Sequence, residues 1–202
     1  GELPDNAALF TIFSFLRSTI VKPSMRPEEL FIKKLLDDVT SAEIKTFSKG
    51  DYVIKEGQIE HAIYFITTGA VRVFRVTEFE EQTIRFGYEG SIITSLSSFL
   101  IGKRTELFIE ALRKTALRII PKERLYSIVN ASIENQAQYT RLLQALIVQQ
   151  MEREIDLLTE SPTKRLQRVL ARSPNLFQEI PLKYIASYLR MTPETLSRIR
   201  NS

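Results

Sequence analysis

Hydrophobic residues follow a strand-like spacing in the middle of the chain and a helical spacing on both sides of it. Between residues 50 and 120, short apolar and aromatic runs alternate with turns, and Val71 and Val73 show the period of two of a half-buried strand. Apart from Gly1, every glycine lies between residues 50 and 102, where tight turns are needed. We expect strands at 52–55, 62–67, 71–76, 83–86, 107–111 and 117–120. Strands at this spacing predict a compact antiparallel barrel or sandwich.

Helical spacing is expected on both sides of this region. Residues 1–40 look helical, with a break at Pro23 and a new start near Pro27. Residues 122–160 contain no glycine or proline and predict one long helix with two apolar stripes. One stripe consists of Leu143, Ile147, Met151, Ile155 and Leu158, and the other of Tyr139, Leu142 and Leu146. We expect one face to cover the barrel and the other to meet a second copy of the chain, with burial inside one subunit as the alternative.

Three short helices are predicted after Pro162, which ends the long helix. They cover residues 163–171, 182–189 and 193–200, and the last two enclose a three-residue turn, as in a helix-turn-helix. Thr192 suits the N-cap of the final helix and Pro193 its first position. Leu196 and Ile199 should face inward, while the outward positions are Glu194, Ser197, Arg198 and Arg200.

Charge is concentrated at the C-terminal end. The chain has a net charge of +4, but residues 161–202 carry eight basic and two acidic residues, against 20 basic and 22 acidic residues before them. A small basic module on a faintly acidic body indicates a polyanionic partner. In DNA, an arginine at position 198 can bind guanine and a glutamate at position 194 can accept from cytosine. The alternative is a solvated basic helix that packs on its own domain.

Composition excludes much catalytic chemistry. The chain has no cysteine and one histidine, which excludes disulfides, thiolate zinc sites, iron–sulfur clusters and multi-histidine metal sites. His61 precedes a predicted strand and is interpreted as a surface or structural residue rather than a haem ligand. Glu78, Glu80 and Glu81 are interpreted as a solvated hairpin tip. We therefore expect no enzyme activity, no metal and no cofactor.

No targeting or membrane segment is expected. The apolar run Leu9–Leu16 is about half of what a bilayer-spanning helix needs, and Arg17 follows it. It lacks the basic flank and small-residue cleavage site of a signal peptide. The expected location is the cytoplasm.

Two separate motifs resemble the Crp/Fnr superfamily of bacterial transcription regulators. The β-roll signature of a cyclic-nucleotide-binding domain is matched by KGDYVIKEG at 49–57, YFI at 64–66 and GAVRV at 69–73, and residues 185–199 resemble the family's helix-turn-helix. The resemblance covers roughly residues 41–202 and implies an α+β fold. The expected domains are N-terminal helices with a β-roll of jelly-roll type at 1–121, a dimerisation helix at 122–160 and an all-α, winged-helix-like domain at 161–202. The resemblance also implies a homodimer on a two-fold site in double-stranded DNA, with RNA polymerase and an unidentified small molecule as further candidate partners.

The same resemblance assigns DNA-contacting positions. They are Arg190, Thr192, Glu194, Thr195, Ser197, Arg198 and Arg200. Glu194 and Arg198 fall on base-reading positions of the family. Pro193 stands where many members have an arginine, and Arg190 stands where a turn glycine is usual.

The effector pocket departs from the family pattern. Members that bind cyclic AMP hold it with a Gly-Glu pair and an Arg-Ser pair, which here align with Thr94-Ser95 and Thr105-Glu106, while a one-residue slip would place Arg104 at the arginine position. An acid beside a phosphate is repulsive, so we expect that cyclic AMP is not the effector. The pocket then holds another small molecule or none. An alternative for the whole chain is a ligand-binding or protein-interaction module whose helix-turn-helix docks on protein.

Overall fold

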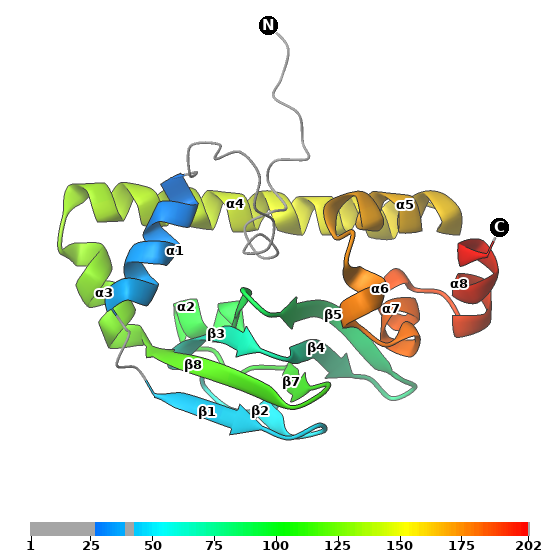
Figure 1. Ribbon diagram of the computed structural model, residues 1–202, viewed down its shortest axis with the longest axis horizontal. Helices are drawn as coiled ribbons and strands as arrows, with labels where there is room; N and C mark the ends of the chain where they lie inside the picture. The colour runs from blue at the N-terminus through cyan, green and yellow to red at the C-terminus, as the bar shows by residue number, and fades with distance from the viewer. Residues whose placement is uncertain (1–26, 39–42, 202) are drawn as a thin grey trace, which may run out of the picture.

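The β-domain consists of two four-stranded antiparallel sheets. The computed structural model describes residues 27–38 and 43–201, and Figure 1 shows the arrangement of its elements. One sheet has the order β1 (Ile44–Phe47), β8 (Thr115–Pro121), β3 (Ala62–Thr68) and β6 (Ile92–Ile93). The other has the order β2 (Tyr52–Ile54), β7 (Phe108–Ala111), β4 (Ala70–Val76) and β5 (Glu81–Tyr88). The predicted antiparallel β-domain is confirmed, while β1 and β6 were not expected.

Apolar side chains from both sheets form the core of this domain. Ile66, Val71, Ile109 and Leu117 are fully buried in one cluster. The turn between β3 and β4 depends on Gly69, whose φ is +98° and whose backbone lies directly against Thr115. A Cβ atom there would clash with the Thr115 hydroxyl, so the turn accepts only glycine.

The N-terminal helix α1 (Pro27–Asp38) begins where the sequence predicts a new helix. Phe31 and Leu35 are buried in a cluster with Leu125, Ile128 and residues of the neighbouring sheet and helices. The helix expected before Pro23 lies outside the described residues.

The segment 122–160 is two helices rather than one. Helix α3 spans Lys122–Asn130 and α4 spans Ile133–Leu158. The break lies at Ser132, whose side chain accepts a hydrogen bond from the N–H of Asn135 and caps the start of α4. The Asn135 side chain then donates to the carbonyl oxygen of Ile128 at 2.6 Å and joins α3 to α4. The break needs neither glycine nor proline, so composition did not reveal it.

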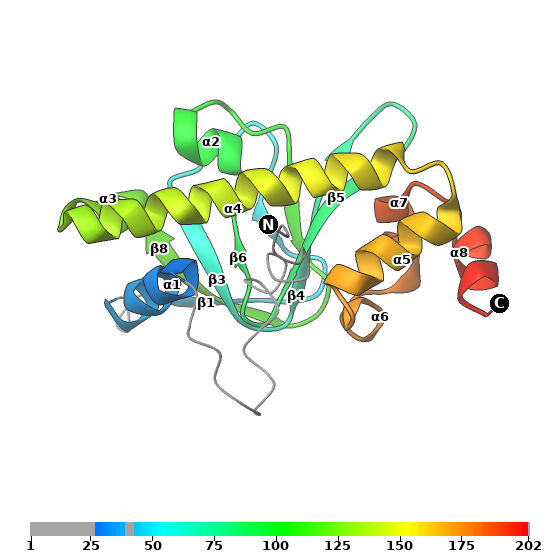
Figure 2. The same cartoon turned by 90° about the horizontal axis from the view of Figure 1, so that it is seen from above.

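The C-terminal helices are α5 (Pro162–Arg172), α6 (Leu176–Glu179), α7 (Leu182–Leu189) and α8 (Pro193–Arg200). The three predicted helices are confirmed, while α6, like α2 (Leu96–Ile101) in the β-domain, was not expected. These helices share a core with Ala70 and Leu112 of the β-domain. The Ser187 hydroxyl on α7 also donates to the carbonyl of Glu81 on β5 and accepts from the N–H of Thr83. Figure 2 shows α4 passing across the β-domain toward these helices.

Candidate functional site

Helices α7 and α8 meet across a tight turn. Ile185, Ala186 and Leu189 on α7 are fully buried, and so is Leu196 on α8. Arg190 ends α7 in the left-handed region, with φ 54° and ψ 50°, and is the only non-glycine described residue with positive φ. The N–H of Met191 donates to the carbonyl of Ala186 and closes the turn. The geometry is that of a helix-turn-helix with an arginine where glycine would be relaxed.

The outer face of α8 carries most of the residues that the sequence predicts to contact DNA. Glu194, Arg198 and Arg200 are exposed, while Thr195 and Ser197 are half-buried. Thr192 is exposed and its Oγ1 accepts from the N–H of Thr195 at 3.2 Å, so it is the N-cap that the sequence predicts. The selected residues Arg190, Thr192, Glu194, Thr195, Ser197, Arg198 and Arg200 all lie on α8 or on the turn before it.

Replacing Thr192 with alanine removes this cap. We expect the free energy of unfolding to fall by about 1 kcal/mol, because an N–H of the first turn loses its acceptor. Urea denaturation of both proteins measures the difference. Thr192→Ser keeps the hydroxyl and should lose much less. An equal loss in the two variants would contradict a contribution from the cap.

The residues expected to line the effector pocket divide into two groups. Ser95 and Thr105 are buried and hydrogen-bonded to each other through their hydroxyls at 2.7 Å, and the Thr94 hydroxyl donates to the carbonyl of Ala62. Arg104 and Glu106 are exposed instead: Arg104 donates to the carbonyl of Gly57, and Glu106 pairs with Lys103. The structure therefore brings Ser95 and Thr105 together and leaves Arg104 and Glu106 on the surface.

A larger apolar cavity lies between the β-domain and α4. Its volume is about 400 Å³, and helix α4 contributes Tyr139, Leu142, Leu143, Leu146 and Gln150 to its wall. Arg85 on β5 is the only charged residue among its described lining residues. Arg85 is not among the site residues predicted from the sequence. A charged residue between Ile84 and Phe86 in a predicted strand is the only sign of it in the sequence. That Arg85 lines a cavity depends on how α4 packs on the β-domain.

The first apolar stripe of α4 is largely uncovered in this chain. Its exposed members are Ile147 (60%), Met151 (57%), Ile155 (46%) and Leu158 (75%). Leu143, the fifth residue of the predicted stripe, is half-buried and lines the apolar cavity. The alternative prediction, that both apolar stripes of the long helix are buried within one subunit, therefore does not hold for this stripe.

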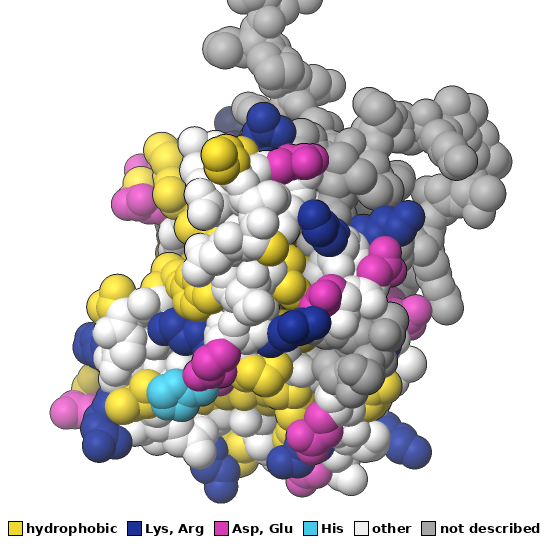
Figure 3. Space-filling view, turned by 90° about the vertical axis from the view of Figure 1, so that its left-hand side faces the viewer, with side chains coloured by type: hydrophobic (Ala, Val, Ile, Leu, Met, Phe, Trp, Pro, Cys, Tyr) yellow, Lys and Arg dark blue, Asp and Glu magenta, His cyan; other side chains and the backbone are white. Residues whose placement is uncertain are grey.

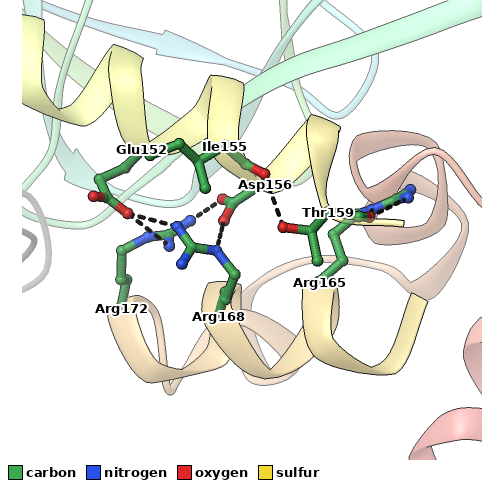
Figure 4. A network of polar contacts seen from close by, with 7 residues as sticks. All are labelled: Glu152, Ile155, Asp156, Thr159, Arg165, Arg168 and Arg172. Atoms are coloured by element: carbon green, nitrogen blue, oxygen red, sulfur yellow. Dashed lines mark hydrogen bonds and ion pairs between the residues drawn. The ribbon is translucent and has the colours of Figure 1, made fainter. Parts of the chain in front are cut away.

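Ion pairs fasten α5 to the end of α4. The carboxylate of Asp156 is fully buried and accepts from Arg172 and from Nε of Arg168, the latter at 2.9 Å. Glu152 binds the same two arginines, at 2.7 Å from Arg168 and 3.5 Å from Arg172. Figure 4 shows these side chains converging between the two helices, beside the bonds from Arg165 to the carbonyl of Thr159. The network fixes the orientation of the C-terminal helices on α4.

His61 is exposed, and Figure 3 shows it on the surface among charged side chains. Its neighbour Glu60 is buried, and its carboxylate accepts from the N–H groups of His61 and Ala62 and from the Tyr64 hydroxyl. Burial raises the pKa of Glu60, and these hydrogen bonds oppose the rise. Within residues 27–38 and 43–201, no group of three or more His, Cys, Asp or Glu is placed to hold a metal ion. None of the described helices combines the length and the apolar character that crossing a bilayer requires.

Comparison with known proteins gives one family match. Residues 44–132 match the family described as "Cyclic nucleotide-binding domain". No curated protein matches the sequence.

Solved structures share the fold over most of the chain. FixK2 from Bradyrhizobium japonicum is 19% identical, with a TM-score of 0.65, over 79% of this chain and 83% of its own. A CooA mutant from Carboxydothermus hydrogenoformans is 18% identical, with a TM-score of 0.63, over 82% and 77%. A putative transcriptional regulator of the Crp/Fnr family from Eubacterium rectale is 20% identical, with a TM-score of 0.59, over 84% and 80%. Residues 44–132 therefore match the cyclic nucleotide-binding domain family, and the chain as a whole shares the α+β fold of FixK2, CooA and the putative Crp/Fnr-family regulator.

Proposed function

We propose that the chain is a transcription regulator that binds double-stranded DNA as a homodimer. The observation that carries the proposal is the outer face of α8, where Glu194, Arg198 and Arg200 are exposed on a helix anchored by the buried Leu196. A short helix held in this way can enter the major groove with its polar side chains toward the bases. The basic charge of residues 161–202 supplies the attraction to phosphates.

The second copy is proposed to bind along α4. Four apolar side chains of one stripe are exposed there, and a two-fold contact between two α4 helices would bury them against their own counterparts. Such a dimer presents two α8 helices to two half-sites. The proposed domains remain 1–121, 122–160 and 161–202, with the hinge near Ser161. The proposed place of action is the bacterial cytoplasm beside RNA polymerase, and no catalytic step is part of the proposal.

The effector is proposed not to be cyclic AMP. Ser95 and Thr105 stand at the positions of the family's glutamate and arginine, and their hydroxyls are buried against each other. Neither side chain carries a charge for the ribose or the cyclic phosphate. Arg104, the alternative phosphate ligand, is exposed and donates to the carbonyl of Gly57.

Selection from a pool of random duplexes tests DNA binding. Purified protein is mixed with the pool across a salt series, and bound duplexes are sequenced. We expect binding that weakens steeply with salt and enriches a two-fold repeat with half-sites about one helical turn apart. A folded dimer that binds no duplex, with or without extracted cell metabolites, would contradict the proposal and favour a protein partner for the helix-turn-helix.

Arg198→Ala tests the base-reading role on the selected site. We expect a loss of about 1–3 kcal/mol in binding free energy per half-site, with relaxed preference at one base pair. Arg190→Gly should instead weaken all duplexes alike and reduce the salt slope by about 1, because a phosphate contact carries no sequence information. Arg75→Ala, an exposed arginine on β4, serves as the control. Unchanged base preference in Arg198→Ala would remove that residue from base recognition.

A further inference from the structure

A second, smaller cavity lies where the β-domain, α4 and the C-terminal helices meet. Its volume is about 90 Å³, and its polar lining residues include Arg85 on β5, Gln149 and Arg153 on α4, and Ser173 and Tyr188 beyond them. One water molecule needs roughly 10–15 Å³, so the cavity can hold a group of several heavy atoms. Three chain segments that are distant in sequence therefore contribute polar side chains to the wall of one cavity.

Hydrogen-bond donors around this cavity lack acceptors. Arg153 is 8% exposed and its Nη1 has no partner, although its other terminal nitrogen donates to the carbonyl of Tyr188. Gln149 is also 8% exposed, and its Nε2 has no partner. Arg85, which is half-buried, forms no hydrogen bond or ion pair with any residue that the structure describes. Buried donors without acceptors are costly, and an anion would satisfy them.

Two carboxylates close to Arg153 along α4 form no ion pair with Arg153 or Arg85. Glu152 and Asp156 pair with Arg168 and Arg172 instead. Burial lowers the pKa of both Arg85 and Arg153, and Tyr188 opposes the fall at both. The positive charges of Arg190, Arg172 and Arg165 lower the pKa of Arg153 further. The cavity thus has an excess of positive charge in a poorly solvated place.

The small cavity adjoins the apolar cavity of about 400 Å³. The two share the lining residues Ile84, Arg85, Ile92 and Gln150. A chamber whose mixed lining includes two arginines therefore lies next to a more apolar chamber whose wall comes mainly from the sheets and α4. Together they are complementary to a molecule with an anionic head and an apolar body.

We propose that the two cavities together bind a small organic acid. The acid group accepts hydrogen bonds from Arg153, Gln149 and Arg85, and the apolar body lies between the β-domain and α4. Arg153 also lies over the ring of Tyr188 on α7, with 3.6 Å from Cζ to the ring centroid. An anion on Arg153 therefore acts on the helix that precedes the turn to α8. This inference rests on the proposed function where it names the effector's class, while binding itself is measurable without DNA.

Thermal unfolding and calorimetry with three probes test the proposal. Octanoate has both an anionic carboxylate and an apolar chain. Octanamide has nearly the same chain with an uncharged amide, and inorganic phosphate has negative charge without an apolar chain. We expect octanoate to raise Tm by about 5 °C at 100 times its Kd, and octanamide and phosphate to bind at least about 10-fold more weakly. Equal binding of octanoate and octanamide would overturn the role of the arginines. Equal binding of octanoate and phosphate would overturn the role of the apolar cavity, and no binding of octanoate would overturn the whole proposal.

Variants assign the binding to these side chains. Arg85→Gln and Arg153→Gln should each weaken octanoate binding at least about 10-fold, whereas Arg75→Gln on the exposed end of β4 should leave it unchanged. Without ligand, Arg85→Gln should have a Tm equal to or above that of the parent, because it removes an unpaired, poorly solvated charge. An unchanged octanoate affinity in Arg85→Gln would contradict the proposal. Since no DNA is present, a failure here is distinct from a failure of the selection experiment.

Discussion

Asp156→Asn is expected to lower the free energy of unfolding by about 3–5 kcal/mol. Its carboxylate is fully buried between α4 and α5 and accepts from Arg168 and Arg172. The asparagine amide is neutral, and its NH₂ group replaces one of the two oxygens that accept from these arginines. Arg172, whose side chain is 9% exposed, then stays buried without its closest anion. Removing one partner from a buried ion pair costs more than the pair itself contributes.

Urea denaturation at equal m-values measures this loss. Glu152→Gln is the matched control, because it removes a carboxylate from the same two arginines at a side chain that is 27% exposed. We expect that control to lose about 1 kcal/mol or less, as partly solvated pairs do. If the two variants lose equal stability, burial of Asp156 is not the source of the effect. The Asp156 variant should also bind the selected operator more weakly, because α5 holds α7 and α8, the helices proposed to bind DNA, on α4.

The double variant Ile147→Asp, Met151→Asp is expected to be monomeric. These two side chains are 60% and 57% exposed at the middle of the uncovered α4 stripe. In a two-fold contact, each new carboxylate would lie near the identical carboxylates of the partner. The interface there would otherwise consist of apolar side chains. Like charges in such an interface cost several kcal/mol, so the dimer Kd should rise by about 1000-fold or more.

Analytical ultracentrifugation over a range of protein concentrations measures the dimer Kd. Phe79→Asp is the control, since Phe79 is 91% exposed in the turn between β4 and β5 and is not part of the α4 stripe. The control should remain dimeric and bind operator normally. A dimeric double variant would place the contact between copies on another surface. A monomer that still binds a two-fold operator at full affinity would separate DNA binding from dimerisation.

Local signals explain what the sequence predicts well. The strands 62–67 and 71–76 are close to β3 and β4, because alternation and bounding glycines are properties of short segments. Helix α8 spans the predicted residues, since a threonine cap and a proline at the first position define its start without help from distant residues. The inward placement of Leu196 follows from the same periodicity.

Features that depend on distant contacts were missed. Strand β1 is mostly exposed and β6 has two residues, so neither carries a clear alternation. The break before α4 depends on a serine cap and a contact between Asn135 and Ile128. Asp156 and Arg85 look like ordinary charged positions in the sequence. Their roles come from what packs around them: two arginines surround Asp156, and Arg85 forms no hydrogen bond or ion pair within residues 27–38 and 43–201.

The Ser95–Thr105 hydrogen bond has an evolutionary consequence. Ser95→Glu alone would bury a carboxylate without a cation, and Thr105→Arg alone would bury a cation without a carboxylate, because both positions are nearly inaccessible to solvent. Only the double change offers each new charge a partner. The hydroxyl pair and a charged pair are thus separated by single mutants that are both destabilised. Selection for stability therefore works against a stepwise change from the hydroxyl pair to a charged pair.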